Sequence, residues 1–246
     1  MALIEEFEKA GNWLFRFRSY LPLVVIGLLF AAMPEYEYLG DNETLNFFWE
    51  GFCLTVSFVG LGIRVITIGH TPRGTSGRNI KRQMANSLNT AGMYSVVRNP
   101  LYLGNFFMGL GVALFPHLWW LAVIYIFSFW LYYERIVFAE EAYLRDKFGS
   151  EFIDWAGVTP AIFPSFGRYR KAELPLSWKN VLRREHNGFF AIIVLMFAID
   201  TVGEFFAADR IGVHRGWAVL LGIGFTIWIT IRLLKKYTTV LKAEGR

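Results

Sequence analysis

The sequence predicts an all-α integral membrane protein, a multi-pass bundle of about six transmembrane helices that includes a helical hairpin. Of its 246 residues, 54% are hydrophobic and only 18% are charged, whereas soluble domains typically carry about 25% charged residues. Several apolar runs approach the roughly 20 residues that an α-helix needs to cross a bilayer. The single cysteine, Cys53, lies inside one of these runs, so the chain cannot form an internal disulfide.

The first 19 residues are predicted to form an amphipathic helix at the membrane surface. The apolar residues of this segment fall near one stripe of a helix. They are Leu3, Ile4, Phe7, Leu14 and Phe15. Three glutamates precede Lys9 and no small-residue cleavage site follows the first apolar run, so a cleaved signal peptide is not expected.

Six apolar segments follow, and each is predicted to be a membrane helix. They lie at residues 20–33, 45–68, 101–115, 118–133, 189–206 and 216–234. The third and fourth segments are short and are joined only by Pro116 and His117. We therefore expect these two segments to form a tight hairpin that is buried among its neighbours.

The distribution of Lys and Arg predicts that both termini face the cytosol, because short loops rich in these residues stay on that side. The loop at 34–44 has four acidic residues and no Lys or Arg, so it is expected outside. The segments 69–100 and 134–188 and the C-terminal tail are basic and are expected inside. Only the loop at 207–215, which holds two arginines, departs from this pattern. The hairpin thus returns both long polar segments to one membrane face.

Two polar stretches carry the candidate site. The first reads G-M-Y-S-V-V-R-N-P-L-Y-L-G over residues 92–104 and places Arg98 two residues before an apolar segment. An arginine at that interface can also be a simple membrane anchor. The second stretch covers residues 132–149 and contains Glu140 and Glu141, which are costly beside a membrane helix unless they are paired or solvated.

At these positions the chain resembles a known family. The pattern G-x-Y-x-x-V-R-N-P-L-Y-L-G, followed about 35 residues later by E-E-x-x-L-x-x-x-F-G-x-x-F-x-x-W, is similar to that of the isoprenylcysteine carboxyl methyltransferases and the related phospholipid methyltransferases. The resemblance implies a helical membrane bundle that binds S-adenosyl-L-methionine at its cytosolic end. We expect three parts: residues 1–68, a methyltransferase core at 69–166, and a two-helix extension at 167–246.

The resemblance also implies which residues form the site. The cofactor-binding positions fall on Asn79, Asn86, Ser87, Leu88, Asn89, Tyr94, Asn99, Pro100, Leu101, Tyr102 and one of Glu140 and Glu141. The family's substrate-holding arginine most nearly matches Arg135. The family usually has His where this chain has Asn99, which can contact a cofactor but cannot titrate or transfer a proton.

The chemistry of the methyl acceptor can be narrowed. An anionic carboxylate or phosphate needs no general base, whereas an amine head group must lose a proton. His117 and His214 are expected on the outer side, and His70 and His186 lie outside the core motif. We therefore predict O-methylation of an anionic lipid group, with Arg135 and Arg98 as the catalytic residues that hold it.

A basic loop at residues 72–82 favours phosphate over carboxylate. Arg73 and Arg78 lie there among glycines and hydroxyls and are predicted to bind the substrate. The same loop can instead reflect the positive-inside rule and contact with anionic lipids. Bacterial members of the family include an enzyme that methylates a lipid A phosphate, and this resemblance implies a bacterial inner membrane protein that acts on a membrane lipid or lipidated substrate.

Two other functions remain open. Sterol reductases share a related helical core and would use NADPH, although they usually carry Asn where this chain has Leu101. A transporter would explain the ionisable residues Arg64, Asp200 and Glu204 within or beside apolar segments. The basic segment 183–187 is interpreted as an interfacial anchor. The sequence predicts neither a metal ion nor a nucleic acid partner, and it leaves the oligomeric state open.

Overall fold

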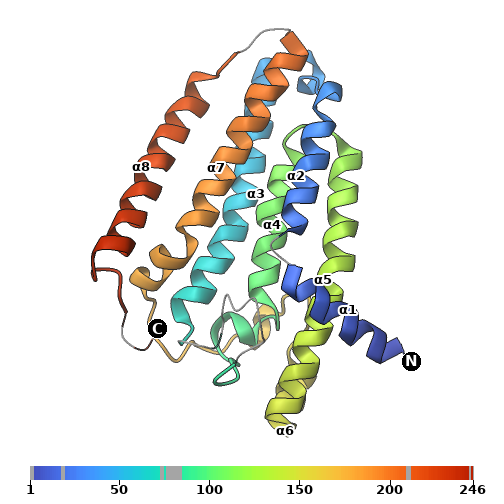
Figure 1. The fold of residues 1–246 in the computed structure, drawn as a ribbon, viewed down its shortest axis with the longest axis vertical. Coiled ribbons are helices and arrows are strands. Elements are labelled where there is room, and N and C mark those ends of the chain that lie inside the picture. The colour runs from blue at the N-terminus through green and yellow to red at the C-terminus, as the bar shows by residue number, and fades with distance from the viewer. Residues whose placement is uncertain are drawn as a thin grey trace.

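The computed structural model describes residues 3–17, 20–72, 75, 85–208, 212–243 and 245. Within these ranges every regular element is helical. The α-helices are α1 (Leu3–Phe17), α2 (Leu21–Ala31), α3 (Glu43–His70), α4 (Pro100–Leu114), α5 (Trp119–Phe148), α6 (Ser150–Val158), α7 (Trp178–Ala208) and α8 (Arg215–Tyr237). Short 3-10 turns lie at η1 (Met33–Glu35), η2 (Leu39–Asp41), η3 (Gly92–Ser95) and η4 (Phe166–Arg168). The long helices form one bundle (Figure 1), and the predicted all-α membrane class is confirmed.

The N-terminal helix α1 lies against the cytoplasm-predicted half of α5. Phe15 is buried beside Tyr132, and the Tyr132 hydroxyl donates a hydrogen bond of 2.9 Å to the Leu14 carbonyl. The ring of Phe7 meets the ring of Phe138 edge-on, with centroids 6.0 Å apart. Three members of the predicted apolar stripe therefore lie on the side of α1 that faces α5.

Helices α3 and α4 pack closely because glycines remove side chains at their contact. A Cβ atom built on Gly60 would lie 2.5 Å from the Gly104 carbonyl oxygen, a separation that real Cβ atoms do not reach. No residue of α4 is exposed. The prediction that this helix is buried among its neighbours is confirmed.

The predicted hairpin is also confirmed. Helix α4 ends at Leu114, α5 begins at Trp119, and the turn passes through Pro116 and His117. His117 has a positive φ of 62°, which non-glycine residues adopt uncommonly and mostly in tight turns. The turn lets α5 run back along α4 and beyond it, so that the second polar stretch belongs to the last turns of α5.

The predicted count of six membrane helices is not confirmed. Among the described residues, four helices are long and apolar enough to cross a membrane: α3, α5, α7 and α8. The pair α1 and α2, bent by 71°, could form a fifth span. Helix α2 has 11 residues and α4 has 15, and each falls short of the roughly 20 residues that a full crossing needs.

The two ends of the bundle differ in chemistry. The acidic loop before α3, the hairpin turn and the connection before α8 meet at one end, where Tyr38 donates to Glu204 and the ring of Tyr36 lies 5.8 Å from that of His117. Residues 85–104, the end of α5 and α6 lie at the other end (Figure 1). Both sequence motifs are therefore at the same end of the molecule.

Candidate functional site

A cavity of about 580 Å³ extends from the motif end into the bundle, between α2, α4, α5 and α7. Its motif end is polar, with Asn89, Arg98 and Glu140 among the lining residues. Its inner end is apolar and includes Leu29, Val112 and residues of α7. A cavity of this size with a few convergent polar groups is the usual form of a small-molecule site.

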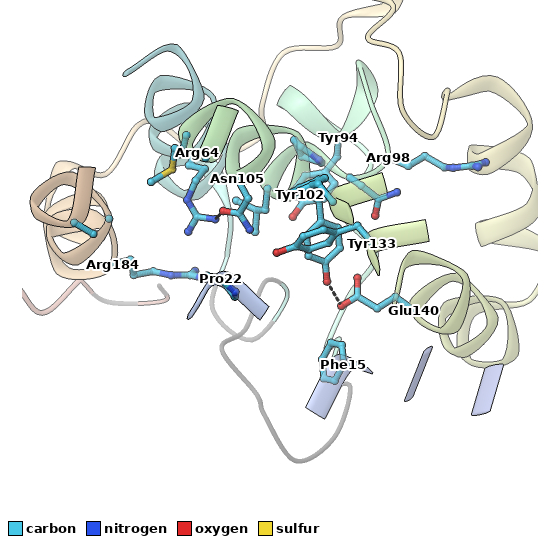
Figure 2. Close-up of a pocket in the computed structure, with 18 of the residues that line it drawn as sticks. Phe15, Pro22, Arg64, Tyr94, Arg98, Tyr102, Asn105, Tyr133, Glu140 and Arg184 are labelled. Carbon is cyan, nitrogen blue, oxygen red and sulfur yellow. Dashed lines mark hydrogen bonds between the residues drawn. The ribbon is translucent and has the colours of Figure 1, made fainter. Parts of the chain in front are cut away.

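The hairpin joins the two motifs through a direct hydrogen bond. The Tyr102 hydroxyl, in the first turn of α4, donates to Glu140 Oε1 on α5 at 2.8 Å (Figure 2). The Tyr102 ring also lies against that of Tyr133, with centroids 4.7 Å apart. All three side chains line the cavity. The fold-back that the sequence predicted thus brings residues 98–102 beside residues 135–141.

Tyr94 is held in the cavity wall by the 3-10 turn η3. The turn begins at Gly92, whose φ of 61° favours glycine, and the Gly92 N–H donates to the Arg170 carbonyl at 2.9 Å. The Trp155 indole donates to the Tyr94 carbonyl at 3.1 Å. Burial and then the negative charge of Glu140 raise the pKa of Tyr94 above its ordinary value. Tyr94 is therefore a neutral hydroxyl donor at physiological pH.

Arg98 connects the first motif to α5 and α6. Its Nε lies 3.0 Å from Glu141 Oε1, and its Nη1 donates to the Ala156 carbonyl at 3.0 Å. Its backbone N–H donates to the Pro160 carbonyl at 2.9 Å. Because all these partners are protein groups, they hold Arg98 and the following Asn-Pro turn in one position.

Most of the residues implied by the resemblance line the cavity. These are Ser87, Leu88, Asn89, Tyr94, Arg98, Asn99, Pro100, Leu101, Tyr102 and Glu140. Asn86 is exposed, and Glu141 is paired with Arg98; neither belongs to the lining. Arg73, Arg78 and Asn79 lie outside the described residues.

Arg135, the predicted substrate-holding arginine, does not line the cavity. Its guanidinium lies over the ring of Phe7 on α1, 4.6 Å from the ring centroid. Its carbonyl oxygen lies where a side chain at Gly11 would be, at 2.1 Å from that Cβ position. Arg135 thus belongs to the contact between α1 and α5, and the geometry gives it no role in holding an anion in the cavity.

Two other arginines line the middle of the cavity instead. Arg64 on α3 donates to Glu185 through Nε at 2.7 Å and Nη2 at 2.8 Å, and its Nη1 donates to Asn105 Oδ1 at 2.6 Å. Arg184 on α7 lines the same cavity (Figure 2). A guanidinium held by three hydrogen bonds keeps one orientation, and both arginines lie between the polar and the apolar ends.

Sequence reasoning missed this arginine pair. The interpretation of residues 183–187 as an interfacial anchor is wrong for Glu185, which is buried and paired with Arg64. A charged residue within an apolar run is a functional candidate by default, and Arg64 carried that signal. Its partner could not be identified, because Glu185 is 121 residues away in the chain.

The apolar end of the cavity is enclosed by helices on all the sides that the described residues form. Val25, Leu29, Val112 and Ile192 line it from α2, α4 and α7. On α4, a Cβ atom at Gly109 would lie 2.3 Å from the Tyr125 hydroxyl, so glycine is needed there. This end suits a hydrocarbon chain, since its walls offer few hydrogen-bonding groups.

Comparison with known proteins gives one family and two relatives. Residues 52–151 match the family described as phospholipid methyltransferase. The cobalt-zinc-cadmium resistance protein CzcN of Cupriavidus metallidurans is 29% identical over 159 residues, which cover 65% of this chain and 69% of that protein. The nickel-cobalt-cadmium resistance protein NccN of Alcaligenes xylosoxydans xylosoxydans is 30% identical over 122 residues, which cover 50% of this chain and 57% of that protein. No solved structure matches the chain.

Proposed function

Since residues 52–151 form a domain of the phospholipid methyltransferase family, we propose that this chain uses S-adenosylmethionine to methylate an anionic group of a membrane lipid at the cytosolic face. The observation that carries the proposal is the cavity itself. Both sequence motifs line its polar end, two arginines line its middle, and apolar side chains from the membrane helices line its inner end.

The polar end fits the cofactor. S-adenosylmethionine carries a sulfonium, an ammonium and a carboxylate, and when bound it supplies an activated methyl group. Glu140 provides an anion for the ammonium, and Tyr102 keeps that carboxylate oriented through its 2.8 Å hydrogen bond. The aromatic faces of Tyr94 and Tyr102 can attract the sulfonium cation. Asn89 and Asn99 add neutral hydrogen-bonding groups to the same wall.

The middle of the cavity fits the acceptor. We assign to Arg64 and Arg184 the anion-holding role that the sequence suggested for Arg135. Guanidinium groups match the geometry of phosphate and carboxylate oxygens through paired N–H donors. Glu185 and Asn105 orient Arg64, while Arg98 positions the Asn-Pro turn through its contacts with Glu141 and Ala156.

An anionic acceptor also fits the absence of a base. None of the four histidines belongs to the described lining; His70 and His186, for example, contact the carbonyls of Leu174 and Leu182. In the proposed reaction an acceptor oxygen forms a bond to the methyl carbon while the carbon–sulfur bond breaks. The sulfonium becomes a neutral thioether, and no proton moves. Holding the two reactants in line can contribute roughly 7–11 kcal/mol to lowering the barrier.

We favour a phosphate over a carboxylate as this oxygen. Two arginines and the basic segment before the first motif supply more positive charge than a single carboxylate needs. The apolar inner end accommodates the lipid chain. A prenylated carboxylate substrate would also place a hydrocarbon there, so the product must be identified chemically.

The test is methylation by the purified protein in lipid nanodiscs with S-adenosylmethionine labelled in its methyl group. A phosphate-bearing lipid, the same lipid after phosphatase treatment, and farnesylcysteine are offered separately. We expect label only with the phosphorylated lipid, in a product that mild alkali does not convert to volatile methanol. Alkali-labile label on farnesylcysteine alone would contradict the choice of acceptor. Failure of the protein to bind S-adenosylmethionine, with NADPH binding instead, would contradict the proposed reaction.

The names of the relatives favour a second, biological role for the same activity. Both relatives are named as resistance proteins for cobalt, cadmium and a third metal. We propose that this chain also contributes to tolerance of divalent metals. Cells that lack the protein are then expected to grow less well on cobalt or cadmium. Wild-type protein should restore growth, whereas Glu140→Gln should restore it only if tolerance is independent of methylation.

A further inference from the structure

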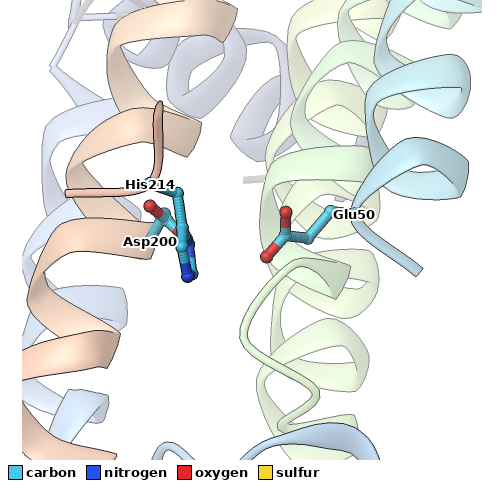
Figure 3. Close-up of side chains that lie close together, drawn as sticks. All are labelled: Glu50, Asp200 and His214. Carbon is cyan, nitrogen blue, oxygen red and sulfur yellow. The ribbon is translucent and has the colours of Figure 1, made fainter. Parts of the chain in front are cut away.

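Three metal-ligating side chains converge at the end of the bundle opposite the cavity. Glu50 comes from the second turn of α3, Asp200 from the last part of α7, and His214 from the residue before α8. One ligand atom from each lies within 4.8 Å of the other two. Figure 3 shows the carboxylate of Glu50 facing the His214 imidazole, which lies beside Asp200.

The two carboxylates of this triad are buried. Glu50 is 7% exposed and Asp200 is 1% exposed. Asp200 Oδ1 pairs with His214 Nδ1 at 2.7 Å, but Asp200 Oδ2 is buried and has no hydrogen-bond partner among the described residues. A buried carboxylate is costly unless it is paired, protonated or bound to a metal. Asp200 therefore has a buried oxygen with free acceptor capacity within the triad.

The groups around the triad hold two of its members in place. Glu50 accepts hydrogen bonds from Asn46 Nδ2 and from the Trp217 indole, each at 2.8 Å. His214 Nε2 lies 3.3 Å from Glu204 Oε1. Metal-binding histidines commonly place their second ring nitrogen against a carboxylate, and metal-binding carboxylates commonly accept further hydrogen bonds. The surroundings thus have the form of the outer partners of a metal site.

We propose that Glu50, Asp200 and His214 bind one divalent transition-metal cation, of the Zn²⁺ or Co²⁺ type. Two carboxylates balance the charge of a divalent ion, and the imidazole favours Zn²⁺ or Co²⁺ over Mg²⁺ and Ca²⁺, which prefer oxygen ligands. Three protein ligands leave a fourth position for water. This site is separate from the proposed methylation site and does not depend on it.

Closing the site requires only a small movement. Two atoms bound to one Zn²⁺ at about 2.1 Å can be at most about 4.2 Å apart, against the present limit of 4.8 Å. His214 can supply this movement, because its side chain is 47% exposed and it lies in the connection before α8. Asp200 and Glu50 can remain on their helices.

The alternative is that the triad is only a structural link between α3, α7 and the start of α8. The two ideas are separated by titrating metal-free, purified full-length protein with Zn²⁺ by calorimetry and with Co²⁺ by visible absorption. We expect one ion per chain and Co²⁺ bands typical of mixed nitrogen and oxygen ligands. Wild-type protein that binds neither ion stoichiometrically would overturn the proposal.

Two variants locate the ion. Asp200→Asn and His214→Gln are each expected to weaken binding by at least about 10-fold, and Glu37→Gln, an exposed acidic residue at the same end, is the matched control. His214 is half exposed, so His214→Gln should fold even if Asp200→Asn does not. Circular dichroism confirms folding. Unchanged affinity in folded His214→Gln, or an equal loss in Glu37→Gln, would place the ion elsewhere and refute the assignment.

Discussion

Two adjacent glutamates near the end of α5 have different surroundings. Glu140 lines the cavity and accepts a hydrogen bond from Tyr102, whereas Glu141 forms an ion pair with Arg98. Successive residues of an α-helix are rotated by about 100°, so neighbours in the sequence face different partners. The sequence identified the pair as part of the site but could not tell which glutamate meets the cofactor.

Glu140→Gln separates charge from shape at this position. Glutamine keeps a carbonyl oxygen for Tyr102 but removes the negative charge expected to meet the cofactor's ammonium. We expect the Kd for S-adenosylmethionine to rise about 10-fold or more, which corresponds to about 1.4 kcal/mol. Equilibrium binding in detergent or nanodiscs measures it.

Glu141→Gln is the matched comparison for that variant. It removes the charge that holds Arg98, so its main effect should be a lower thermal unfolding temperature. Its effect on cofactor affinity should be smaller than that of Glu140→Gln. The reverse order of the two affinities would assign the cofactor contact to Glu141.

The Arg64–Glu185 pair allows structure and function to be tested separately. Arg64→Met leaves the buried Glu185 carboxylate without its cationic partner, which should destabilise the fold by about 3–5 kcal/mol. Arg64→Met combined with Glu185→Met removes both charges and should recover most of that stability. Methylation should stay lost in the double variant while S-adenosylmethionine still binds. Restored methylation in the double variant would show that Arg64 has only a structural role.

At the scale of the elements, the contact between α3 and α4 sets the position of the first motif. Lipid does not drive helices together by the hydrophobic effect, so close packing of small residues carries this contact. A Cβ atom at Gly104 would lie 2.5 Å from Arg64 Cγ and 2.8 Å from the Gly60 carbonyl. The glycines therefore bring Arg64 beside the helix that carries Tyr102 and Asn105.

Gly60→Ala should separate the two helices. Its Cβ would lie 2.5 Å from both the Gly104 carbonyl oxygen and the Met108 nitrogen, and such backbone atoms cannot move without shifting α4. We expect a loss of about 1–3 kcal/mol in stability, together with reduced methylation. Unfolding by a denaturing detergent measures the first effect.

Gly62→Ala is the control on the same helix. A Cβ atom at Gly62 meets nothing within 4 Å, and alanine is intrinsically the better helix former by about 1 kcal/mol. This variant should be as stable as the wild type or slightly more stable. Equal destabilisation by both substitutions would mean that the close α3–α4 contact is absent.

At the scale of the whole molecule, the bundle has two chemically different ends. Both methyltransferase motifs and the polar end of the cavity lie at one end, and the acidic loop, the hairpin turn and the Glu50–Asp200–His214 triad lie at the other. The positive-inside rule assigns the motif end to the cytosol. The methylation site and the proposed metal site would then face opposite sides of the membrane.

Single cysteines at exposed positions test this orientation. Glu37→Cys at the acidic end should react with a membrane-impermeant maleimide added to intact cells, and Lys171→Cys at the motif end should react only in inverted vesicles. Both positions are exposed. The native Cys53 is buried and should stay unlabelled in the parent protein. Labelling of Lys171→Cys from outside would reverse the topology and the cytosolic assignment of the methylation site.

The sequence alone determined the helical membrane class, the hairpin and the meeting of its two motifs. Each of these depends on local properties: apolar runs, breakers such as Pro116, and a connection too short to allow any other path. Tertiary structure decided that α2 and α4 are shorter than full spans. It also decided that Arg135 packs on α1 while Arg64 and Arg184 line the cavity. These outcomes depend on side chains far apart in the chain, such as Arg64 and Glu185 across 121 residues, and only the packing of the helices determines which of them meet.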